Sequence, residues 1–404
     1  MNRRRKRPNY FGWAVFVLVV LFGYYFNQVY LPANPIMVGP TPTPTRSPES
    51  FVAEAQSLFA EGKLLPAIDA YRAAINASPQ DSSLYVALAR VQVFAGQYEE
   101  AEKNAKNALL LNGNNALAHG VHAWALDFQE GKNGEAQSSI QDALNLDPNN
   151  ALIQAYYVEI LVSSGFDGYE TAAEHSKIAL ALDSNIVETH RARALILEAT
   201  GNYPEAIAEY NAAIDINPNI PALYIGLGLN YRILQVYDEA IAAFTRANAL
   251  NPADPFPDLY ISRTYATIGE YAKSLQYAEA AVQDRPDSAS LRGNLGVMYY
   301  RNFLWPEAIQ QLGYTIYGGK TEDGVEIEGI PLVNDVRVAE YYYTYGLALA
   351  RTNQCGEALP IAQMLQSRIP ANENAVSAAS EIGRICEEQL SNPSANVPVP
   401  TSTP

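Results

Sequence analysis

Residue types that could support catalysis or bind a metal are few in this chain and widely spaced. The four histidines are His119, His122, His175 and His190. His119 and His122 lie three residues apart on one predicted helix and could share a metal ion, but no third or fourth ligand is evident near them. We interpret all four as surface or packing histidines. No serine, cysteine or carboxylate pair stands in a recognisable catalytic setting, so we predict that the protein is not an enzyme and has no metal or cofactor.

One short motif invites a nucleotide-binding interpretation. Gly319, Lys320 and Thr321 match the end of a phosphate-binding loop. The earlier glycine that such a loop needs is Gly313, which is one residue too far away. The motif also follows a predicted helix, whereas a phosphate-binding loop connects a strand to a helix. We therefore exclude nucleotide binding at this position.

The elements that position these residues follow a fixed period. Seven positions, most of them prolines and called marks below, recur at intervals of 34, 35, 36, 34, 34 and 34 residues. They are Pro79, Gly113, Pro148, Ser184, Pro218, Pro252 and Pro286. A period of this length indicates one supersecondary unit that cannot bury its own apolar face. Stacked units bury those faces jointly and leave a long curved surface for partners.

The spacing inside the period predicts two helices per unit. A turn glycine such as Gly201 precedes most marks by 17 residues, and an aromatic residue such as Tyr203 follows the turn. Small residues recur twelve and five positions before each mark, as Ala206 and Ala213 do. Apolar residues return every three or four positions between the marks, which is helical periodicity. Each unit is therefore predicted to be two antiparallel helices joined by a tight turn.

This pattern resembles the tetratricopeptide repeat. The run Ala222–Asn251 holds much of the family pattern in order: Leu227, Gly228, Tyr231, Tyr237, Ala240, Phe244, Ala247 and then Pro252. Seven units cover residues 48–288, an eighth opens at Ala289 and a ninth covers 339–372. The resemblance covers about four fifths of the chain. It implies an all-α fold, a right-handed α-solenoid of about nine helix-turn-helix repeats, in which the first helices line a concave groove.

The N-terminal residues predict a membrane anchor. Residues 1–10 carry a basic cluster, and residues 11–31 are almost entirely apolar. Twenty-one helical residues span about 30 Å, the thickness of the hydrocarbon core of a bilayer. The basic segment should stay in the cytoplasm, so the repeats would be extracytoplasmic. No clear cleavage site follows, which favours an uncleaved transmembrane signal anchor over a removed signal peptide.

Two further segments are expected to lack regular structure. Residues 32–47 form a Pro/Thr-rich linker, and residues 392–404 form a disordered tail. The remaining composition is acidic, since the whole chain has 27 basic and 43 acidic residues and a net charge of −16. Such a surface argues against nucleic acid as a partner.

The candidate partner-binding residues are arginines and tyrosines that the repeat register places on first helices. They are Arg191, Arg232, Arg263, Tyr300, Arg301, Tyr343 and Arg351. Because guanidinium pairs bidentately with carboxylate, such a groove could select a peptide carboxylate or an acidic segment. The alternative is that these arginines form intramolecular bridges with neighbours such as Glu188 and Glu198. The particular Lys and Asn set of the carboxylate-clamp members of the family is not found.

The C-terminal part departs from the period. Repeats one to eight are assigned to residues 48–318, and an insertion at 316–338 precedes repeat nine and a capping helix at 339–391. Alternation at Val325–Glu328, with glycine turn signals before it, predicts a short β-hairpin in the insertion. Cys355 and Cys386 lie almost one period apart, on adjacent turns of the stack, so outside the cytoplasm they would form a disulfide that fixes the terminal cap. The alternative is two unpaired buried thiols.

Taken together, these features predict a membrane-anchored tetratricopeptide scaffold that binds partner proteins or peptides in its concave groove, outside the cytoplasm. One alternative is a self-assembling structural protein of the envelope, that is, a homo-oligomer. Another is an enzyme accessory subunit that uses the insertion at 316–338.

Overall fold

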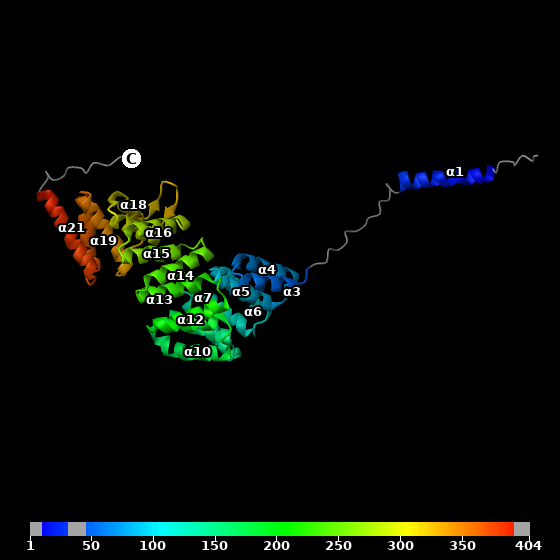
Figure 1. Cartoon of the computed structure of the whole chain (residues 1–404), viewed down its shortest axis with the longest axis horizontal. Coiled ribbons are helices and arrows are strands. Elements are labelled where there is room, and N and C mark those ends of the chain that lie inside the picture. The colour runs from blue at the N-terminus through cyan, green and yellow to red at the C-terminus, as the bar shows by residue number, and fades with distance from the viewer. Residues whose placement is uncertain (1–9, 31–45, 392–404) are drawn as a thin grey trace, which may run out of the picture. The chain divides into compact units, whose positions relative to one another are not determined.

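The computed structural model describes residues 10–30 and 46–391. It divides into two compact units, Met1–Ser47 and Pro48–Pro404, which are considered separately. The predicted basic segment, the Pro/Thr-rich linker and the disordered tail lie outside the described residues, apart from Tyr10, Arg46 and Ser47. Figure 1 shows the labelled helices in chain order.

The first unit is one apolar helix. It consists of α1 (Tyr10–Tyr25), which continues into the π-helical turn η1 (Phe26–Tyr30). Phe11–Val29 forms an apolar stretch of 19 residues. A helix of this length that is apolar on every side is typical of a membrane span. Its length and composition fit a single-pass anchor, and a signal sequence would meet the same criteria.

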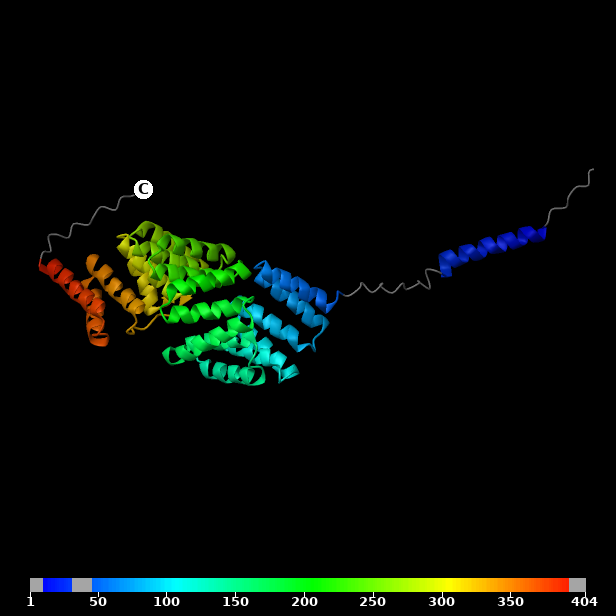
Figure 2. The same cartoon turned by 60° about the horizontal axis from the view of Figure 1, so that its bottom comes forward.

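The second unit is an α-solenoid, as predicted. Residues 48–368 form nine antiparallel helix pairs, and each pair packs on the next (Figure 2). Units one to nine are α3 (Pro48–Ala60) with α4 (Leu64–Ala77), α5 (Ser82–Phe94) with α6 (Tyr98–Leu111), α7 (Ala116–Asp127) with α8 (Asn133–Leu146), α9 (Ala151–Ser163) with α10 (Tyr169–Leu182), α11 (Val187–Ala199) with α12 (Tyr203–Ile216), α13 (Pro221–Ile233) with α14 (Tyr237–Leu250), α15 (Pro255–Thr267) with α16 (Tyr271–Asp284), α17 (Ala289–Arg301) with α18 (Trp305–Tyr317), and α19 (Val336–Arg351) with α20 (Cys355–Arg368).

Small side chains allow the two helices of a unit to approach closely. The alanines that recur before each mark have no exposed surface: Ala67, Ala74, Ala206, Ala213, Ala240 and Ala247. Larger side chains such as Phe244 and Ile261 fill the space between neighbouring units. In unit four, whose period is 36 residues, a short 3₁₀ turn, η2 (Phe166–Gly168), lies between the two helices, and the helix pair is retained.

The turn between the helices needs one residue in the left-handed conformation in every unit. Gly62 adopts it with φ +74°. In units six, eight and nine the same place is taken by Gln235, Phe303 and Asn353, with φ of 62°, 63° and 63°. This conformation costs a residue with a Cβ atom roughly 1–2 kcal/mol. The turn is therefore set by the packing of the pair, and glycine only makes it easier.

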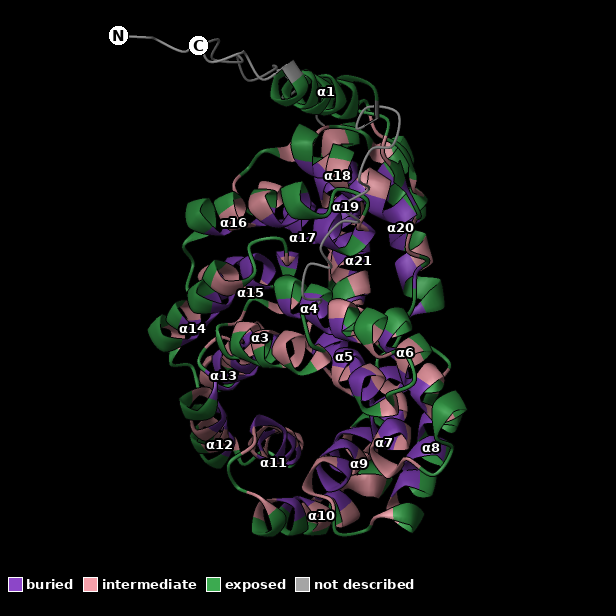
Figure 3. Ribbon diagram, turned by 90° about the vertical axis from the view of Figure 1, so that its right-hand side faces the viewer, coloured by how far each residue is buried: buried purple, intermediate pink, exposed green. Residues whose placement is uncertain are grey.

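The first half of the solenoid closes on itself. The turn of unit one lies against the connection between α12 and α13: Asn219 Nδ2 donates to the Ala60 carbonyl oxygen at 3.0 Å, and Asn217 Nδ2 donates to that of Phe59 at 3.4 Å. A Cβ atom on Gly62 would sit 2.4 Å from Asn219 Cβ, so the contact requires glycine there. In the view of Figure 3, the helices from α3 to α13 are arranged around a ring.

Side chains of the first five units occupy their own inner surface. An aromatic row runs through it, with ring centroids 5.4 Å apart for Phe59 and Phe94 and 5.2 Å apart for Phe94 and Trp124. Arg90 on α5 donates two hydrogen bonds to Glu188 on α11, at 2.5 and 2.9 Å. These contacts join residues 98 positions apart in the chain. The inner surface of units one to five is thus engaged by intramolecular contacts.

The insertion folds back onto the array. Its strands β1 (Gly319–Lys320) and β2 (Glu326–Ile327) pair antiparallel, which confirms the predicted hairpin. Beyond it, the Tyr342 hydroxyl donates to the Ile330 carbonyl at 2.8 Å, and Ile330 N donates to the Thr315 carbonyl at 2.8 Å. α19 starts at Val336, three residues before the boundary expected at 339, because the Asp335 side chain caps it by accepting from the backbone N–H of residues 337 and 338.

A capping helix ends the array. α21 (Glu373–Ser391) packs on α19 and α20. Cys355, at the start of α20, and Cys386, near the end of α21, form a disulfide with their Cα atoms 5.6 Å apart. The bond closes a loop of 31 residues, and loops of this size gain about 3–4 kcal/mol of stability from such a bond. The cap is therefore held both by packing and covalently.

The closure makes Arg90 a test of the first half. Arg90→Met would leave the carboxylate of Glu188, which has no exposed surface, without its counter-charge. Removing one partner of a buried ion pair costs about 3–5 kcal/mol, so we expect the free energy of unfolding to fall by that amount and amide hydrogen exchange in α5 and α11 to accelerate. The measurement is hydrogen-exchange mass spectrometry with urea unfolding of the full chain in detergent.

The double variant Arg90→Met with Glu188→Leu is the control for the charge. Replacing both members of a buried pair with apolar side chains is often close to neutral, so it should recover most of the lost stability. Exchange rates in α5 and α11 that stay unchanged in the single variant would contradict the role assigned to this pair.

Candidate partner-binding groove

Arg191 lies inside the first half of the solenoid, units one to five, which we call the closed half. On α11, its Nη2 is 3.2 Å from Glu159 Oε2, and its guanidinium lies over the rings of Trp124 and Phe128 at 5.5 and 5.9 Å from their centroids. Glu188, a partner suggested by the sequence, is already paired within the same half. Of the candidate arginines, Arg191 is therefore the one that forms an ion pair with a carboxylate among the described residues.

Glu159 makes this interior sensitive to pH. It is buried on α9, and its Oε2 accepts a hydrogen bond from Trp124 Nε1 at 2.7 Å. Its Oε1 has no hydrogen-bond partner among the described residues. Burial raises the pKa of Glu159 to about 7, although Arg191 and the indole bond oppose that rise. The closed half therefore contains a carboxyl that titrates near neutral pH.

Four arginines converge on the inner side of units six to nine. They are Arg232 on α13, Arg263 on α15, Arg301 on α17 and Arg337 on α19. Burial lowers the pKa of Arg232, and the positive charges of Arg263 and Arg337 lower it further. Burial also lowers the pKa of Arg263, and Arg337 again opposes its charge. Within residues 46–391, Arg232, Arg263 and Arg301 form no ion pair with a carboxylate, whereas Arg337 pairs with Glu340 at 3.0 Å.

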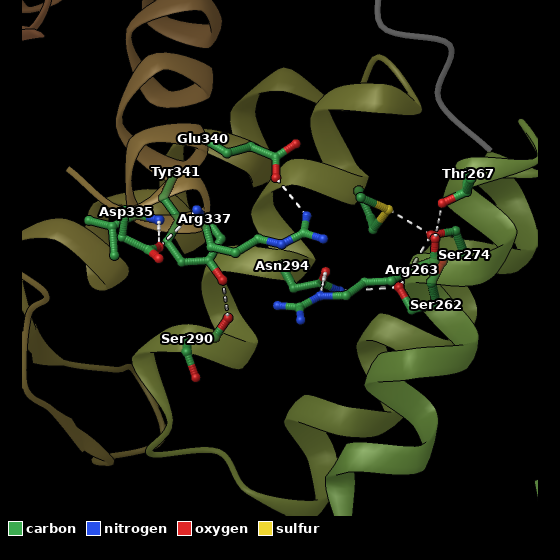
Figure 4. A network of polar contacts seen from close by, with 12 residues as sticks. Ser262, Arg263, Thr267, Ser274, Ser290, Asn294, Asp335, Arg337, Glu340 and Tyr341 are labelled. Carbon is green, nitrogen blue, oxygen red and sulfur yellow. Dashed lines mark hydrogen bonds and ion pairs between the residues drawn. The ribbon is translucent and has the colours of Figure 1, made fainter. Parts of the chain in front are cut away.

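A pocket opens where three of these arginines meet. Its volume is about 200 Å³, and α15, α17 and α19 supply most of its wall. Arg263, Arg301, Arg337, Asn294, Glu340 and Tyr341 line it. Figure 4 shows Arg263 and Arg337 extending toward the same space from opposite walls. We call this the arginine pocket.

Buried polar groups hold Arg263 in place. Arg263 Nε donates to Asn294 Oδ1 at 3.3 Å, and Asn294 Nδ2 donates to Ser262 Oγ at 3.1 Å. Ser262 Oγ lies 3.2 Å from Ser274 Oγ (Figure 4). Asn294, Ser262 and Ser274 are all buried. The guanidinium is therefore oriented before any partner arrives, which lowers the entropy cost of binding.

The opposite wall depends on a glycine. The Tyr341 ring packs directly on the backbone of α17, where a Cβ atom on Gly293 would lie 2.7 Å from it. The Tyr341 hydroxyl donates to the Ser290 carbonyl at 3.1 Å, one turn earlier on the same helix. These contacts bring the N-terminal turn of α19, and with it Arg337, close to α17.

The other candidate residues lie further along the same first helices. Arg351 Nε donates to the Tyr300 hydroxyl at 3.1 Å, and its guanidinium is 5.9 Å from the Trp305 ring centroid. Tyr343 is half-buried, and the charges of Arg301 and Arg337 act on its hydroxyl. The structure thus brings Tyr300 to Arg351 and places Tyr343 near the arginine pocket.

The sequence did not single out Arg337, Asn294 or Tyr341. Arg337 fell inside the stretch assigned to the insertion, although Asp335 before an apolar helical run was a usable N-cap signal. Asn294 and Tyr341 lie on the first helices α17 and α19, at positions to which the repeat pattern assigned no particular role. Their role follows only from contacts between different units.

The histidines are separately engaged. His119 Nε2 lies 3.0 Å from the Gly113 carbonyl oxygen, and His122 Nδ1 lies 2.9 Å from Ser139 Oγ. Burial lowers the pKa of His122 to about 4. Among the residues that the structure describes, no group of three or more His, Cys, Asp or Glu is placed to hold a metal ion.

Four sequence models of the family match the chain. Those described as tetratricopeptide repeat match residues 58–125, 221–254 and 261–323, and one described as TPR repeat matches residues 199–233. The matched residues fall within units one to three and five to eight. With the nine helix pairs of the structure, they show that this chain belongs to the tetratricopeptide repeat family. No curated protein matches the chain.

One solved structure shares the fold, and two others are less similar. A chain in the crystal structure of the APC/C hetero-tetramer Cut9-Hcn1 is similar with a TM-score of 0.62 and 16% identity, over 80% of this chain and 59% of that chain. A tetratricopeptide repeat protein from Parabacteroides merdae has a TM-score of 0.42 and 17% identity, over 62% and 98%. A thermophilic TPR protein in Thermus thermophilus, TTC0263, has a TM-score of 0.39 and 23% identity, over 46% and 98%. This chain therefore spans 59% of the length of the Cut9-Hcn1 chain, and that likeness shows the fold alone.

Glu159 predicts how stability depends on pH. Because its pKa is about 7 in the folded protein and 4.5 when unperturbed, the folded state holds the proton more tightly. Stability should fall as pH rises from about 4.5 to about 7, by about 1–3 kcal/mol, and change little from this group outside that window. Glu159→Gln should remove that slope, measured as the free energy of unfolding against pH.

Glu205→Gln, an exposed carboxylate on α12, is the matched control and should keep the slope. The comparison concerns the slope alone, because Glu159→Gln also removes the counter-charge of Arg191. Identical pH profiles for the wild-type protein and Glu159→Gln would contradict the assignment.

Proposed function

We propose that this protein is a membrane-anchored scaffold that binds partner proteins or peptides on the inner side of units six to nine, outside the cytoplasm. One observation carries the proposal. The inner surface of the first half is engaged by its own side chains, while Arg232, Arg263 and Arg301 in the second half have no carboxylate partner among the described residues.

Unpaired arginines in an acidic protein need a physical reason. The chain has 43 acidic residues for 27 basic ones, so carboxylates are abundant, yet the described ones leave these guanidiniums unpaired. Crowded, partly desolvated positive charges repel one another and cost stability. Clusters of perturbed charges in a pocket are typical of functional sites. An acidic partner segment would offset that cost on binding.

Tyrosines complete the proposed contact surface. Tyr300 and Tyr343 lie on α17 and α19, and Arg351 already holds the Tyr300 hydroxyl. Tyrosine offers a large rigid face and one polar atom, and it is enriched where proteins bind one another. The proposed groove therefore consists of Arg232, Arg263, Tyr300, Arg301, Arg337, Tyr343 and Arg351.

The membrane and the compartment rest on separate features. α1 and η1 supply an apolar segment of sufficient length, and the basic residues before it favour a cytoplasmic N-terminus. The disulfide between Cys355 and Cys386 fits an oxidising compartment, since such bonds are rare in the cytosol. Both arguments favour the extracytoplasmic side for the repeats.

Site-specific photo-crosslinking in cells tests the binding role. A photoreactive amino acid at Tyr300 or Tyr343 should give adducts of the full-length protein with partners, because both positions lie in the proposed groove. The same amino acid at Leu110, which is 85% exposed on the second helix α6, is the control and should give none. Adducts are detected by gel shift and mass spectrometry.

Equal labelling from Leu110 and from the groove positions would overturn the proposal. Groove adducts that consist only of two copies of this chain would also overturn it, in favour of self-assembly.

Protease treatment of intact cells or spheroplasts tests the topology. We expect protease to remove the repeat array, and Cys355 and Cys386 to react with a thiol reagent only after reduction, because the disulfide would be intact outside the cytoplasm. Protection of the array together with immediate thiol labelling would show that the repeats are cytoplasmic.

A further inference from the structure

We propose that the arginine pocket binds two neighbouring carboxylates of an acidic segment in the partner. The inference rests on the proposed function, since it names the chemistry that the groove would recognise. It is carried by the charges, the position and the size of the pocket, together with the insertion that completes it.

The charge balance of the pocket calls for two negative charges. Arg263, Arg301 and Arg337 contribute three positive charges, and Glu340 is the one acidic residue that lines the pocket. Glu340 already pairs with Arg337 at 3.0 Å. Arg232 adds a fourth positive charge from α13. It is close enough for the charges of Arg263 and Arg337 to lower its pKa. A ligand with two carboxylates would balance the unpaired guanidiniums of the pocket.

The three arginines differ in exposure in a way that suits a side chain entering from solvent. Arg263 is half-buried at the back of the pocket and is fixed by Asn294. Arg301 and Arg337 are exposed at the rim. One carboxylate can therefore reach Arg263 while its neighbour remains between the two rim arginines. Bidentate pairing with planar guanidinium groups then determines the orientation.

The size of the pocket favours side chains over a small-molecule cofactor. Its volume is about 200 Å³. Sites that enclose drug-sized ligands usually measure about 300–1,000 Å³ and are mostly apolar. This pocket is smaller, and three arginines, Glu340 and Asn294 line it together with apolar side chains such as Val297 and Met298. Two carboxyl groups fit such a space while the backbone that carries them stays in the groove.

The insertion builds this pocket. α19 has 16 residues, whereas α13, α15 and α17 have 13 each, and the extra length includes an N-terminal turn with Arg337. The insertion leads into that turn through Asp335, which caps it, and is tied to α19 by the bond from Tyr342 to Ile330. A repeat without the insertion would have no guanidinium at this place.

Fluorescence anisotropy with defined peptides tests the proposal. The probe is a labelled octapeptide of glycine and serine with two adjacent glutamates, and the matched peptide carries two glutamines instead. The full-length protein in non-ionic detergent should bind only the acidic peptide, saturably. Arg337→Gln and Arg263→Gln should each weaken binding about ten-fold or more, because each removes a charge-assisted pair.

Two further variants make the result specific. Arg246→Gln removes an exposed arginine on the second helix α14, away from the pocket, and should leave the affinity unchanged. Glu340→Gln removes the internal competitor for Arg337 and should strengthen binding several-fold, an effect that a merely structural role would not produce. Circular dichroism confirms that each variant is folded.

Several results would overturn the assignment. These are equal affinity for the glutamine peptide, no effect of Arg337→Gln, or a phosphoserine peptide or inorganic phosphate that binds more than ten-fold tighter than the acidic peptide. The last result would make the pocket a phosphoryl site. If crosslinks from Tyr300 and Tyr343 persist in Arg337→Gln and the acidic peptide does not bind, only this inference fails. If the peptide binds and those crosslinks are absent, only the proposed function fails.

Discussion

Curvature is the constraint on which the rest of this structure depends. Each helix pair buries its apolar face on the next, and the small rotation from unit to unit accumulates until the turn of unit one meets the start of unit six. In the closed first half, side chains of the protein itself contact one another across the inner surface. Phe59, Phe94 and Trp124 pack there as core side chains do. Curvature therefore divides the array of repeats into a closed first half and a second half that does not close on itself.

Arginines on first helices have different surroundings in the two halves of the solenoid. Arg90 and Arg191 extend inward from first helices, as Arg263 and Arg301 do, but they meet Glu188 and Glu159. A buried ion pair adds little net stability, because desolvation offsets most of the attraction, but it penalises any arrangement that separates the charges. In the first half the pairs thus favour closure. In the second half, the described carboxylates leave Arg263 and Arg301 without an ion pair.

Much of the fold could be predicted from local pattern. The period, the alanines and the turn positions specify the helix pairs, even where Gln235, Phe303 and Asn353 replace the turn glycine. The closure could not be predicted, because it depends on a summed rotation that no single unit encodes. For that reason Arg191 and Arg263, which both lie on first helices, could not be told apart from the sequence. Arg337 was hidden for a different reason, since it lies in a stretch without repeat register.

A regular repeat cannot make a unique site by itself, because every unit offers the same positions to the groove. The insertion before unit nine breaks that equivalence. It adds an N-terminal turn to α19, and the contact of Tyr341 with Gly293 brings that turn against α17. Arg337 then faces Arg263 across the arginine pocket (Figure 4). In this protein the departure from the repeat, more than the repeat itself, accounts for where a partner would be recognised.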